Sequence, residues 1–150
     1  MTETLQAIEI ETKPTPSHSV IWLHGLGADG NDFVPIVREL SLPPPGIRFV
    51  FPHAPMRPVT INEGFVMRAW YDIVNQGGEM TEDGQGVRQS QKMVEELIKK
   101  EASRGVPMNR IVLAGFSQGG AIALHTGLRQ PAQLAGVMSL SAYLPLMSTF

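Results

Sequence analysis

The chain has 150 residues, a hydrophobic fraction of 43% and a formal net charge of −2, which fit one folded domain. Its acids and bases are interspersed, so charge gives no case for binding nucleic acid or an anionic membrane surface. There is no cysteine, which excludes disulfides, thiolate zinc sites and a cysteine nucleophile. The first ten residues carry acids where a signal peptide carries bases, and no apolar run approaches a membrane-spanning length. We expect a cytoplasmic protein that is not an integral membrane protein.

Strand and helix patterns alternate from the N-terminus onward. Residues 5–10, LQAIEI, are typical of an edge strand, and residues 19–24, SVIWLH, are apolar almost throughout, as in a strand buried on both faces. Asn31 or Asp32 can cap a helix that has on one face Phe33, Ile36, Val37 and Leu40. Residues 47–52, IRFVFP, are the next expected strand. This order of strand, helix and strand is the repeating unit of a parallel sheet.

The second half continues the alternation. A helix is expected over residues 85–104, ended by Gly105, with a face made of Val87, Val94, Leu97 and Ile98. A third core strand is expected over residues 110–115, a helix of small residues over residues 118–129, and a fourth strand within residues 134–144. The pattern predicts an α/β fold with a mainly parallel sheet and helices on both faces. In such sheets the chemistry lies beyond the carboxyl ends of the strands.

A glycine-rich turn follows the first buried strand, in VIWLHGLGADGNDF. Gly25, Gly27 and Gly30 match the G-x-G-x-x-G spacing of dinucleotide-binding loops. That function also needs an acidic residue about twenty residues further on, where it holds the ribose hydroxyls. No acidic residue lies between Glu39 and Glu63, so the dinucleotide hypothesis rests on the glycines alone. A tight structural turn and a loop for another ligand are the other interpretations.

The sequence GFSQG, residues 115–119, follows another buried strand and precedes the helix of small residues. G-x-S-x-G in that context is typical of a nucleophile elbow, which projects the serine hydroxyl above the sheet. Gly115, Gly119 and Gly120 would let the strand and the helix approach closely. Ser117 is therefore a candidate nucleophile at a helix N-terminus, where negative charge is favoured. The alternative is an N-cap serine in an ordinary strand-to-helix turn.

An esterase elbow also needs an oxyanion hole. One donor is the backbone N–H of the residue after the nucleophile, here Gln118, and the other comes from a loop after an earlier strand. HGLG, residues 24–27, lies where that loop is expected, and its glycines let the backbone approach a substrate. We expect the backbone N–H of Leu26 to be the second donor.

These motifs resemble those of the carboxylesterase/phospholipase branch of the α/β-hydrolases, which includes bacterial carboxylesterases and the acyl-protein thioesterases. The resemblance rests on HGLGADGNDF, FPHAPMRPVTINEG, MRAWYDI, GFSQGGAIALHTGL and LSAYLP, and runs from about residue 20 to residue 145. It implies the α/β-hydrolase fold and hydrolysis of carboxylic esters, lysophospholipids or acyl thioesters, acylated proteins included. The reaction would use a Ser-His-Asp triad and no metal or organic cofactor.

The resemblance also assigns roles to residues. Ser117 matches the family nucleophile, and Leu26 and Gln118 match its oxyanion donors. The loop over residues 55–70 matches the segment that borders the acyl-binding cleft. From the residues themselves, we expect Leu26, Met67, Trp70 and Phe116 to bind the substrate, because a flexible thioether such as that of Met67 adapts to varied acyl chains. Ordinary core packing is the alternative for Met67 and Trp70.

The triad is incomplete in this sequence. After Ser117 there is no Asp or Glu, and the only later histidine, His125, lies eight residues along the same helix. Eight helical residues span about 12 Å, so this ring should not reach the serine hydroxyl and is more simply a helix-face residue. His24 belongs to the oxyanion loop and is expected to orient it.

We therefore expect residues 1–150 to be a single domain that holds the N-terminal two-thirds of the family fold, with the C-terminal part missing. The strand near Val137 would then be a bare sheet edge that favours association, such as a homo-oligomer. The chain can be a fragment of a longer protein, can be completed by a partner chain, or can be a natural truncation that lost catalysis. The alternative function is accordingly an acyl-binding module or an incomplete hydrolase.

Overall fold

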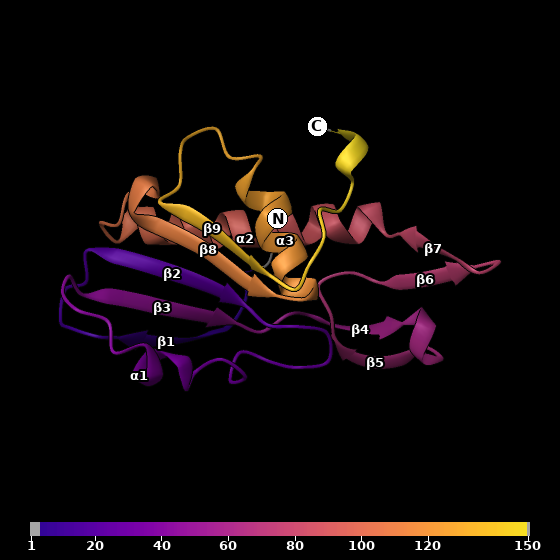
Figure 1. The fold of residues 1–150 in the computed structure, drawn as a ribbon, viewed down its shortest axis with the longest axis horizontal. Coiled ribbons are helices and arrows are strands. Elements are labelled where there is room, and N and C mark those ends of the chain that lie inside the picture. Colours follow the sequence, from indigo (N-terminus) through magenta and orange to yellow (C-terminus); the bar gives the residue numbers. More distant parts are fainter. Residues whose placement is uncertain (1–3, 150) are drawn as a thin grey trace.

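A five-stranded sheet forms the centre of the protein (Figure 1). The computed structural model describes residues 4–149. The strands of the sheet span Ala7–Glu11 (β1), His18–Leu23 (β2), Ile47–Pro52 (β3), Ile111–Phe116 (β8) and Gly136–Leu140 (β9). Their order is β1-β3-β2-β8-β9, and β1 alone is antiparallel to its neighbour within this sheet. The expected N-terminal edge strand and the four expected strands that follow it are confirmed.

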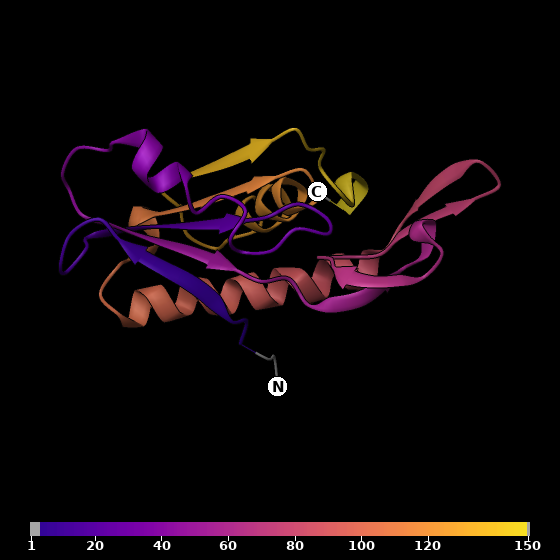
Figure 2. The ribbon, with the colours of Figure 1, turned by 90° about the horizontal axis from the view of Figure 1, so that it is seen from below.

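Helices cover both faces of the sheet, which explains the apolar character of the central strands. In β2, Ile21 and Leu23 are fully buried in the cluster beneath α2 (Gly84–Ser103) and α3 (Gln118–Gly127). Trp22 points to the other face, where α1 (Ile36–Leu40) packs. Figure 2 shows α1 on one side of the sheet and α2 on the other. The α/β-hydrolase arrangement of a mainly parallel sheet between two helical layers is confirmed.

α2 has the buried face that the sequence predicts. The carboxylate of its N-cap residue, Asp83, accepts the Gly86 N–H at 3.0 Å. The helix ends just before Gly105, whose φ of 97° suits a glycine. The four predicted apolar residues are at most 3% exposed: Val87, Val94, Leu97 and Ile98.

The helix after the glycine-rich loop is shorter than expected. It begins at Ile36, so neither Asn31 nor Asp32 caps it. The preceding segment forms successive turns, in which the Ile36 N–H donates to the Phe33 carbonyl at 3.0 Å. Bonds between residues three apart wind the chain too tightly for an α-helix. The predicted apolar contact still forms, because the Phe33 ring lies 5.1 Å from the Trp22 ring.

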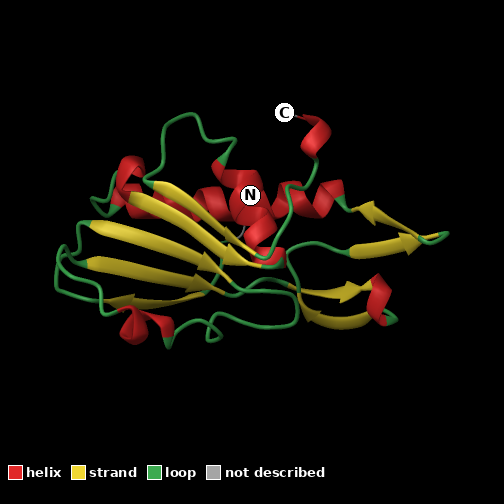
Figure 3. Cartoon of the chain, viewed as in Figure 1, coloured by secondary structure: helices red, strands yellow, loops and turns green. Residues whose placement is uncertain are grey.

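Two hairpins extend from the end of the sheet at which β2, β3 and β8 finish (Figures 1 and 3). The resemblance describes residues 55–70 as a loop, but most of this segment forms the first hairpin. The hairpin strands are β4 (Met56–Val59) with β5 (Phe65–Arg68), and β6 (Ile73–Gln76) with β7 (Glu79–Glu82). Short 3-10 helices span Thr60–Asn62, Met108–Arg110 and Met147–Thr149.

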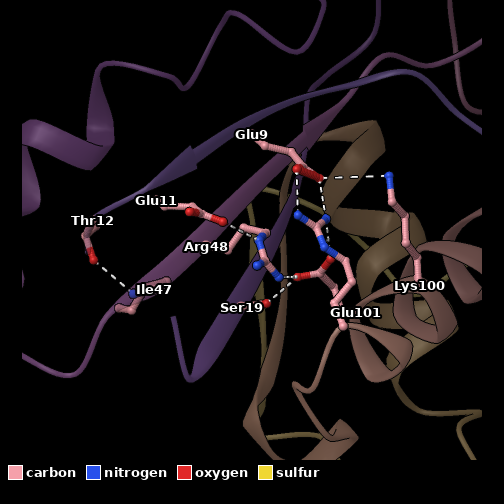
Figure 4. Close-up of polar contacts among 9 residues, drawn as sticks. Glu9, Glu11, Thr12, Ser19, Ile47, Arg48, Lys100 and Glu101 are labelled. Carbon is pink, nitrogen blue, oxygen red and sulfur yellow. Dashed lines mark hydrogen bonds and ion pairs between the residues drawn. The ribbon is translucent and has the colours of Figure 1, made fainter. Parts of the chain in front are cut away.

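A buried ionic network ties the end of α2 to three strands (Figure 4). The carboxylate of Glu101, 1% exposed, accepts hydrogen bonds from the Ser19 hydroxyl at 2.5 Å, from Arg48 at 2.9 Å and from Arg104 at 3.1 Å. Arg104 also donates to Glu9 on β1 at 2.6 Å. Ser19 and Arg48 belong to β2 and β3, so the network holds α2 against β1, β2 and β3.

β9 forms one edge of the sheet within residues 4–149. Its side chains Val137, Met138 and Leu140 are 36–38% exposed. Among the described residues, no helix has the length and apolarity needed to cross a membrane.

Candidate active site

Ser117 lies at the junction between β8 and α3, above the carboxyl end of a central strand. Its φ of 55° and ψ of −120° are a strained conformation for a residue with a side chain. The Ser117 N–H donates to the Leu140 carbonyl at 2.8 Å, and its carbonyl accepts from the Ala121 N–H at 3.0 Å. Hydrogen bonds on both sides therefore hold the sharp turn that GFSQG predicts.

The glycines around Ser117 are required by close packing. A Cβ atom on Gly119 would overlap the backbone of Leu23 and His24, and one on Gly115 would overlap the backbone of Gly119. A Cβ atom on Gly120 would lie 2.9 Å from the Gly115 carbonyl oxygen. Strand β8, helix α3 and the end of β2 therefore approach as closely as backbones allow, which brings HGLG beside the elbow.

His24 holds the HGLG loop in place. Its Nδ1 donates to the Gly25 carbonyl at 2.7 Å, and its Nε2 accepts from the Ala54 N–H at 2.9 Å. These contacts define a neutral imidazole, and burial lowers the pKa of His24 in the same direction. Further along, the Gly27 N–H donates to the Arg68 carbonyl at 2.9 Å. The loop is thus pinned on both sides of Leu26.

The backbone N–H groups of Leu26 and Gln118 are free to donate. Neither group has a hydrogen-bond acceptor among residues 4–149. The Gln118 N–H belongs to the first turn of α3, where helical N–H groups lack intrahelical partners. Both residues line one cavity together with Ser117. Two unpaired donors beside a serine hydroxyl are the arrangement that an oxyanion hole requires.

The cavity at Ser117 has a volume of about 380 Å³. One wall comes from the second hairpin, through Ile73 and Met80, and another from the segment after β9. Tyr71 and Tyr143 also line it, with their hydroxyl oxygens 3.1 Å apart, and burial raises the pKa of Tyr71. The sequence contains a turn signal for this second hairpin, although neither of its strands was among the expected elements. Gly77 and Gly78, with φ of 61° and 86°, form a two-residue hairpin loop.

Two carboxylates also line this cavity. Burial acts to raise the pKa of Asp72, but hydrogen bonds from Thr60 and from the Ile73 N–H lower it overall. The carboxylate of Glu82 accepts the Leu146 N–H at 2.9 Å. Both groups hold backbone segments at the cavity wall.

The side chain of Gln118 connects the elbow to the segment before the second hairpin. Its Oε1 accepts the Trp70 N–H at 2.7 Å, and its Nε2 donates to the Tyr71 carbonyl at 2.8 Å. The Ser90 hydroxyl of α2 donates to the Trp70 carbonyl, and the Trp70 indole N–H donates to the His24 carbonyl at 2.8 Å. One network therefore positions the elbow, the HGLG loop and the cavity wall together.

Three of the residues expected to bind substrate do not line the cavity. Trp70 is 0% exposed and lies beneath the site, where its indole supports the His24 carbonyl. Phe116 packs against Phe33, with ring centroids 5.7 Å apart, and Met67 lies beside Gly27. In this geometry Trp70 positions the loop, whereas Leu26 lines the cavity as expected. Substrate contact by Met67 and Phe116 stays a prediction.

Each histidine ring is held away from the Ser117 hydroxyl, which has no hydrogen-bond partner among residues 4–149. His125 is 1% exposed, and its Nε2 lies 2.8 Å from the Gln91 amide oxygen. His53 accepts the Gly30 N–H through Nδ1 at 3.0 Å. The prediction that His125 is a helix-face residue agrees with this position, and no general base contacts the serine in the described part of the chain.

The glycine-rich loop is not arranged as a dinucleotide cradle. Such a cradle needs a helix N-terminus directly after the glycines. Here α1 begins six residues after Gly30 and is five residues long. Among residues 4–149 there is also no group of three or more His, Asp or Glu side chains that could hold a metal ion.

Comparison with known proteins gives consistent matches. The sequence matches the model of the phospholipase/carboxylesterase family over residues 5–150. It is 40% identical over 149 residues to acyl-protein thioesterase 1 of Cryptococcus neoformans, covering 97% of this chain and 63% of that protein. It is 40% identical over 150 residues to acyl-protein thioesterase 1 of Schizosaccharomyces pombe, covering 100% of this chain and 66% of that protein.

The fold gives the same result. The crystal structure of Arabidopsis thaliana SOBER1 matches with a TM-score of 0.77 at 35% identity, covering 88% of this chain and 64% of that one. The chain thus spans just under two thirds of the length of the relatives that it matches. Because the family model covers nearly every residue and the fold agrees, this chain belongs to the phospholipase/carboxylesterase family of α/β-hydrolases.

Proposed function

We propose that this chain supplies the nucleophile and the oxyanion hole of a serine hydrolase that cleaves carboxylic esters or acyl thioesters. The observation that carries the proposal is the meeting of the Ser117 hydroxyl with two free backbone N–H groups, those of Leu26 and Gln118, in one cavity. The strained elbow and the close-packed glycines support it, because they hold these groups in place before a substrate arrives.

In the proposed reaction, the Ser117 Oγ attacks the acyl carbonyl carbon while a general base accepts the hydroxyl proton. The carbonyl oxygen becomes an oxyanion and receives hydrogen bonds from the Leu26 and Gln118 N–H groups. Collapse of this intermediate expels an alcohol or thiol, which takes the proton from the base. Water then cleaves the acyl-enzyme by the same steps and releases a carboxylic acid.

The cavity wall and the relatives bear on the substrate. Ile73, Met80 and Tyr71 give the cavity an apolar side beside Ser117, which suits an acyl chain. The two fungal relatives are named acyl-protein thioesterases. We infer that the acyl group lies along the second hairpin, and that the leaving group is the thiol of an acylated protein or the alcohol of a lipid or small ester.

The general base is the part of the triad that these residues do not supply. The resemblance implies a His general base that is held by an Asp. In the family, the Asp and then the His follow the nucleophile along the chain. Residues 118–150 contain no Asp or Glu, and His125 is held by Gln91. This observation favours a second candidate function, in which the 150 residues bind acyl groups in the Ser117 cavity without hydrolysing them.

Labelling with a fluorophosphonate, followed by intact-mass and peptide mass spectrometry, tests the first function. Where the protein also supplies the general base, we expect one adduct per chain, on Ser117, and none in Ser117→Ala. The matched control is Ser141→Ala, because Ser141 is another serine that lines the same cavity. Loss of the label in Ser141→Ala but not in Ser117→Ala would contradict the assignment of the nucleophile.

Calorimetric titration with a non-hydrolysable acyl thioether separates the two functions. Binding of the thioether by a folded chain that takes no fluorophosphonate supports the acyl-binding function. Labelling together with thioester turnover supports the hydrolase. A folded chain that shows neither binding nor labelling contradicts both.

A further inference from the structure

A second cavity lies apart from the Ser117 site and shares no lining residue with it. Its volume is about 550 Å³. It is bounded by the segment before β1, by the residues after β3, by the first hairpin and by α2. Figure 2 shows β1, in indigo, beginning beside the middle of α2. Four separate parts of the chain therefore meet around a space that the proposed hydrolysis does not use.

The lining of this second cavity is basic. It contains His53, Arg57, Arg68 and Lys92, and none of its lining residues among residues 4–149 is an Asp or Glu. The chain as a whole has a net charge of −2. Cationic side chains from β4, β5 and α2 therefore line one cavity, and no Asp or Glu lines it with them.

Several of these side chains have N–H groups that donate no hydrogen bond within the described residues. The Nε atom of Arg57 is buried and has no hydrogen-bond partner among residues 4–149. Arg68 uses one terminal nitrogen on the Ala54 carbonyl at 3.0 Å, which leaves the rest of its guanidinium available. Because Nδ1 of His53 accepts the Gly30 N–H, the proton of the neutral ring lies on Nε2. A buried donor without a partner costs free energy, which a ligand with acceptor oxygens would recover.

The carboxylates that act on Arg57, those of Asp83 and Asp72, are already engaged. Asp83 accepts the N–H groups of Asp72 and Gly86, at 2.8 and 3.0 Å. Asp72 accepts from Thr60, and Glu9, which lines a neighbouring cavity, is paired with Arg104. Burial lowers the pKa of Arg57, and the nearby Asp83 and Asp72 only partly oppose this. The charge of Arg57 therefore lacks a direct partner.

We propose that this cavity binds the phosphate monoester group of a ligand. A phosphate monoester carries up to two negative charges and three terminal oxygens, which match several convergent donors better than a single carboxylate does. A guanidinium can hold two of these oxygens at once, and a lysine ammonium adds a point charge. The phosphate group would come from a free phosphorylated metabolite or from a lipid headgroup.

Isothermal titration with glycerol 3-phosphate tests the proposal, with glycerol as the uncharged control. We expect saturable binding of one molecule per chain, weakened about tenfold by Lys92→Gln, which removes one charge-assisted contact. Lys99→Gln is the matched control, because Lys99 is an exposed lysine on the same helix and lines neither cavity. Ser117→Ala should bind as the unchanged protein does, so the outcome is independent of the proposed hydrolysis.

Arg57→Lys keeps the charge but removes the planar donor, and should also weaken binding, with thermal melting as the check that it folds. Sedimentation with vesicles of phosphatidic acid, compared with phosphatidylcholine, identifies the source of the phosphate. Lys92-dependent binding to phosphatidic acid indicates a lipid headgroup, and binding of glycerol 3-phosphate alone indicates a soluble metabolite. The proposal is overturned if neither ligand binds, or if Lys92→Gln and Lys99→Gln weaken binding equally.

Discussion

At the scale of single residues, the candidate site depends on glycines, which have no Cβ atom, as much as on the side chains around it. Ser117 occupies a strained conformation, and the strain persists because the surrounding backbone is packed without side chains at Gly115, Gly119 and Gly120. The same close approach leaves the N–H groups of Leu26 and Gln118 beside the serine. Preorganisation here is a consequence of backbone packing.

Gly119→Ala should therefore destabilise the fold strongly. The added methyl group would overlap the Leu23 and His24 carbonyl oxygens, and neither backbone can move without disturbing the sheet. We expect a loss of about 1–3 kcal/mol or more in the free energy of unfolding, measured by urea titration. Gly136→Ala is the control, because a Cβ atom there meets nothing within 4 Å. Equal stability of the two variants would contradict the packing argument.

At the scale of elements, α2 is attached to the sheet by charge at its C-terminal end and by apolar packing along its length. Glu101 is the centre of the ionic contact, with Ser19, Arg48 and Arg104 as donors. Arg48 is 7% exposed, so its charge depends on carboxylate partners. A buried pair of this kind adds little net stability when intact but costs much when one partner is lost.

Glu101→Gln should lower the free energy of unfolding by about 3–5 kcal/mol, because it removes the anion from beside a buried guanidinium. Urea titration measures the effect. Glu96→Gln on the same helix is the matched control, since the Glu96 side chain is 40% exposed and pairs with Lys99 at 3.3 Å. It should change stability by less than about 1 kcal/mol. A small effect of Glu101→Gln would show that the network relaxes around the neutral amide.

At the scale of the whole molecule, two buried histidines on different elements link folding to pH. Burial lowers the pKa of both His24 and His125 in the folded state. Protonating His24 would also put a second N–H against the Ala54 N–H, which now donates to its Nε2. The hydrogen bond from Arg104 lowers the pKa of Glu9. The stability that Glu9 contributes is therefore lost only in stronger acid, below the pH range in which the histidines titrate.

Stability should accordingly fall as the pH is lowered from 7.5 to 5.5. The pKa of a histidine is about 6.5 in the unfolded chain, and the pKa values of His24 and His125 are lower in the folded chain. The unfolded state therefore binds more protons in this pH window, which favours unfolding. Urea midpoints at the two pH values measure the change, and His125→Gln should show a smaller one. A midpoint that does not change, or rises, on acidification would contradict neutral burial of these rings.

Much of the fold follows from local sequence patterns. Residues 47–52 form β3 as predicted, and α2 is displaced by one residue at each end from the predicted helix. These elements have a strong apolar period and clear stop signals, so local interactions and burial agree. α1 shows the limit of this reasoning. Phe33 and Ile36 pack against the sheet as their spacing predicts, but the backbone between them forms turns and is not helical.

The hairpins were harder to predict because their strands are short and half-exposed. Phe65 and Val66 are 67% and 60% exposed, so no alternation of buried and exposed residues marks β5 as a strand. Gly77 and Gly78 did mark a turn between the strands of the second hairpin. Its role as a wall of the Ser117 cavity depends on where the whole ribbon folds back, which no local signal specifies.

The sequence alone determined the family, the order of the core elements and the identities of Ser117, Leu26 and Gln118 as candidates, because each depends on residues adjacent in the chain. Tertiary structure decided what surrounds them. The Trp70 indole lies buried beneath the HGLG loop, and the Gln118 side chain contacts the Trp70 backbone. These contacts join residues about fifty positions apart. They are set by the packing of strands and helices, so only the folded chain reveals them.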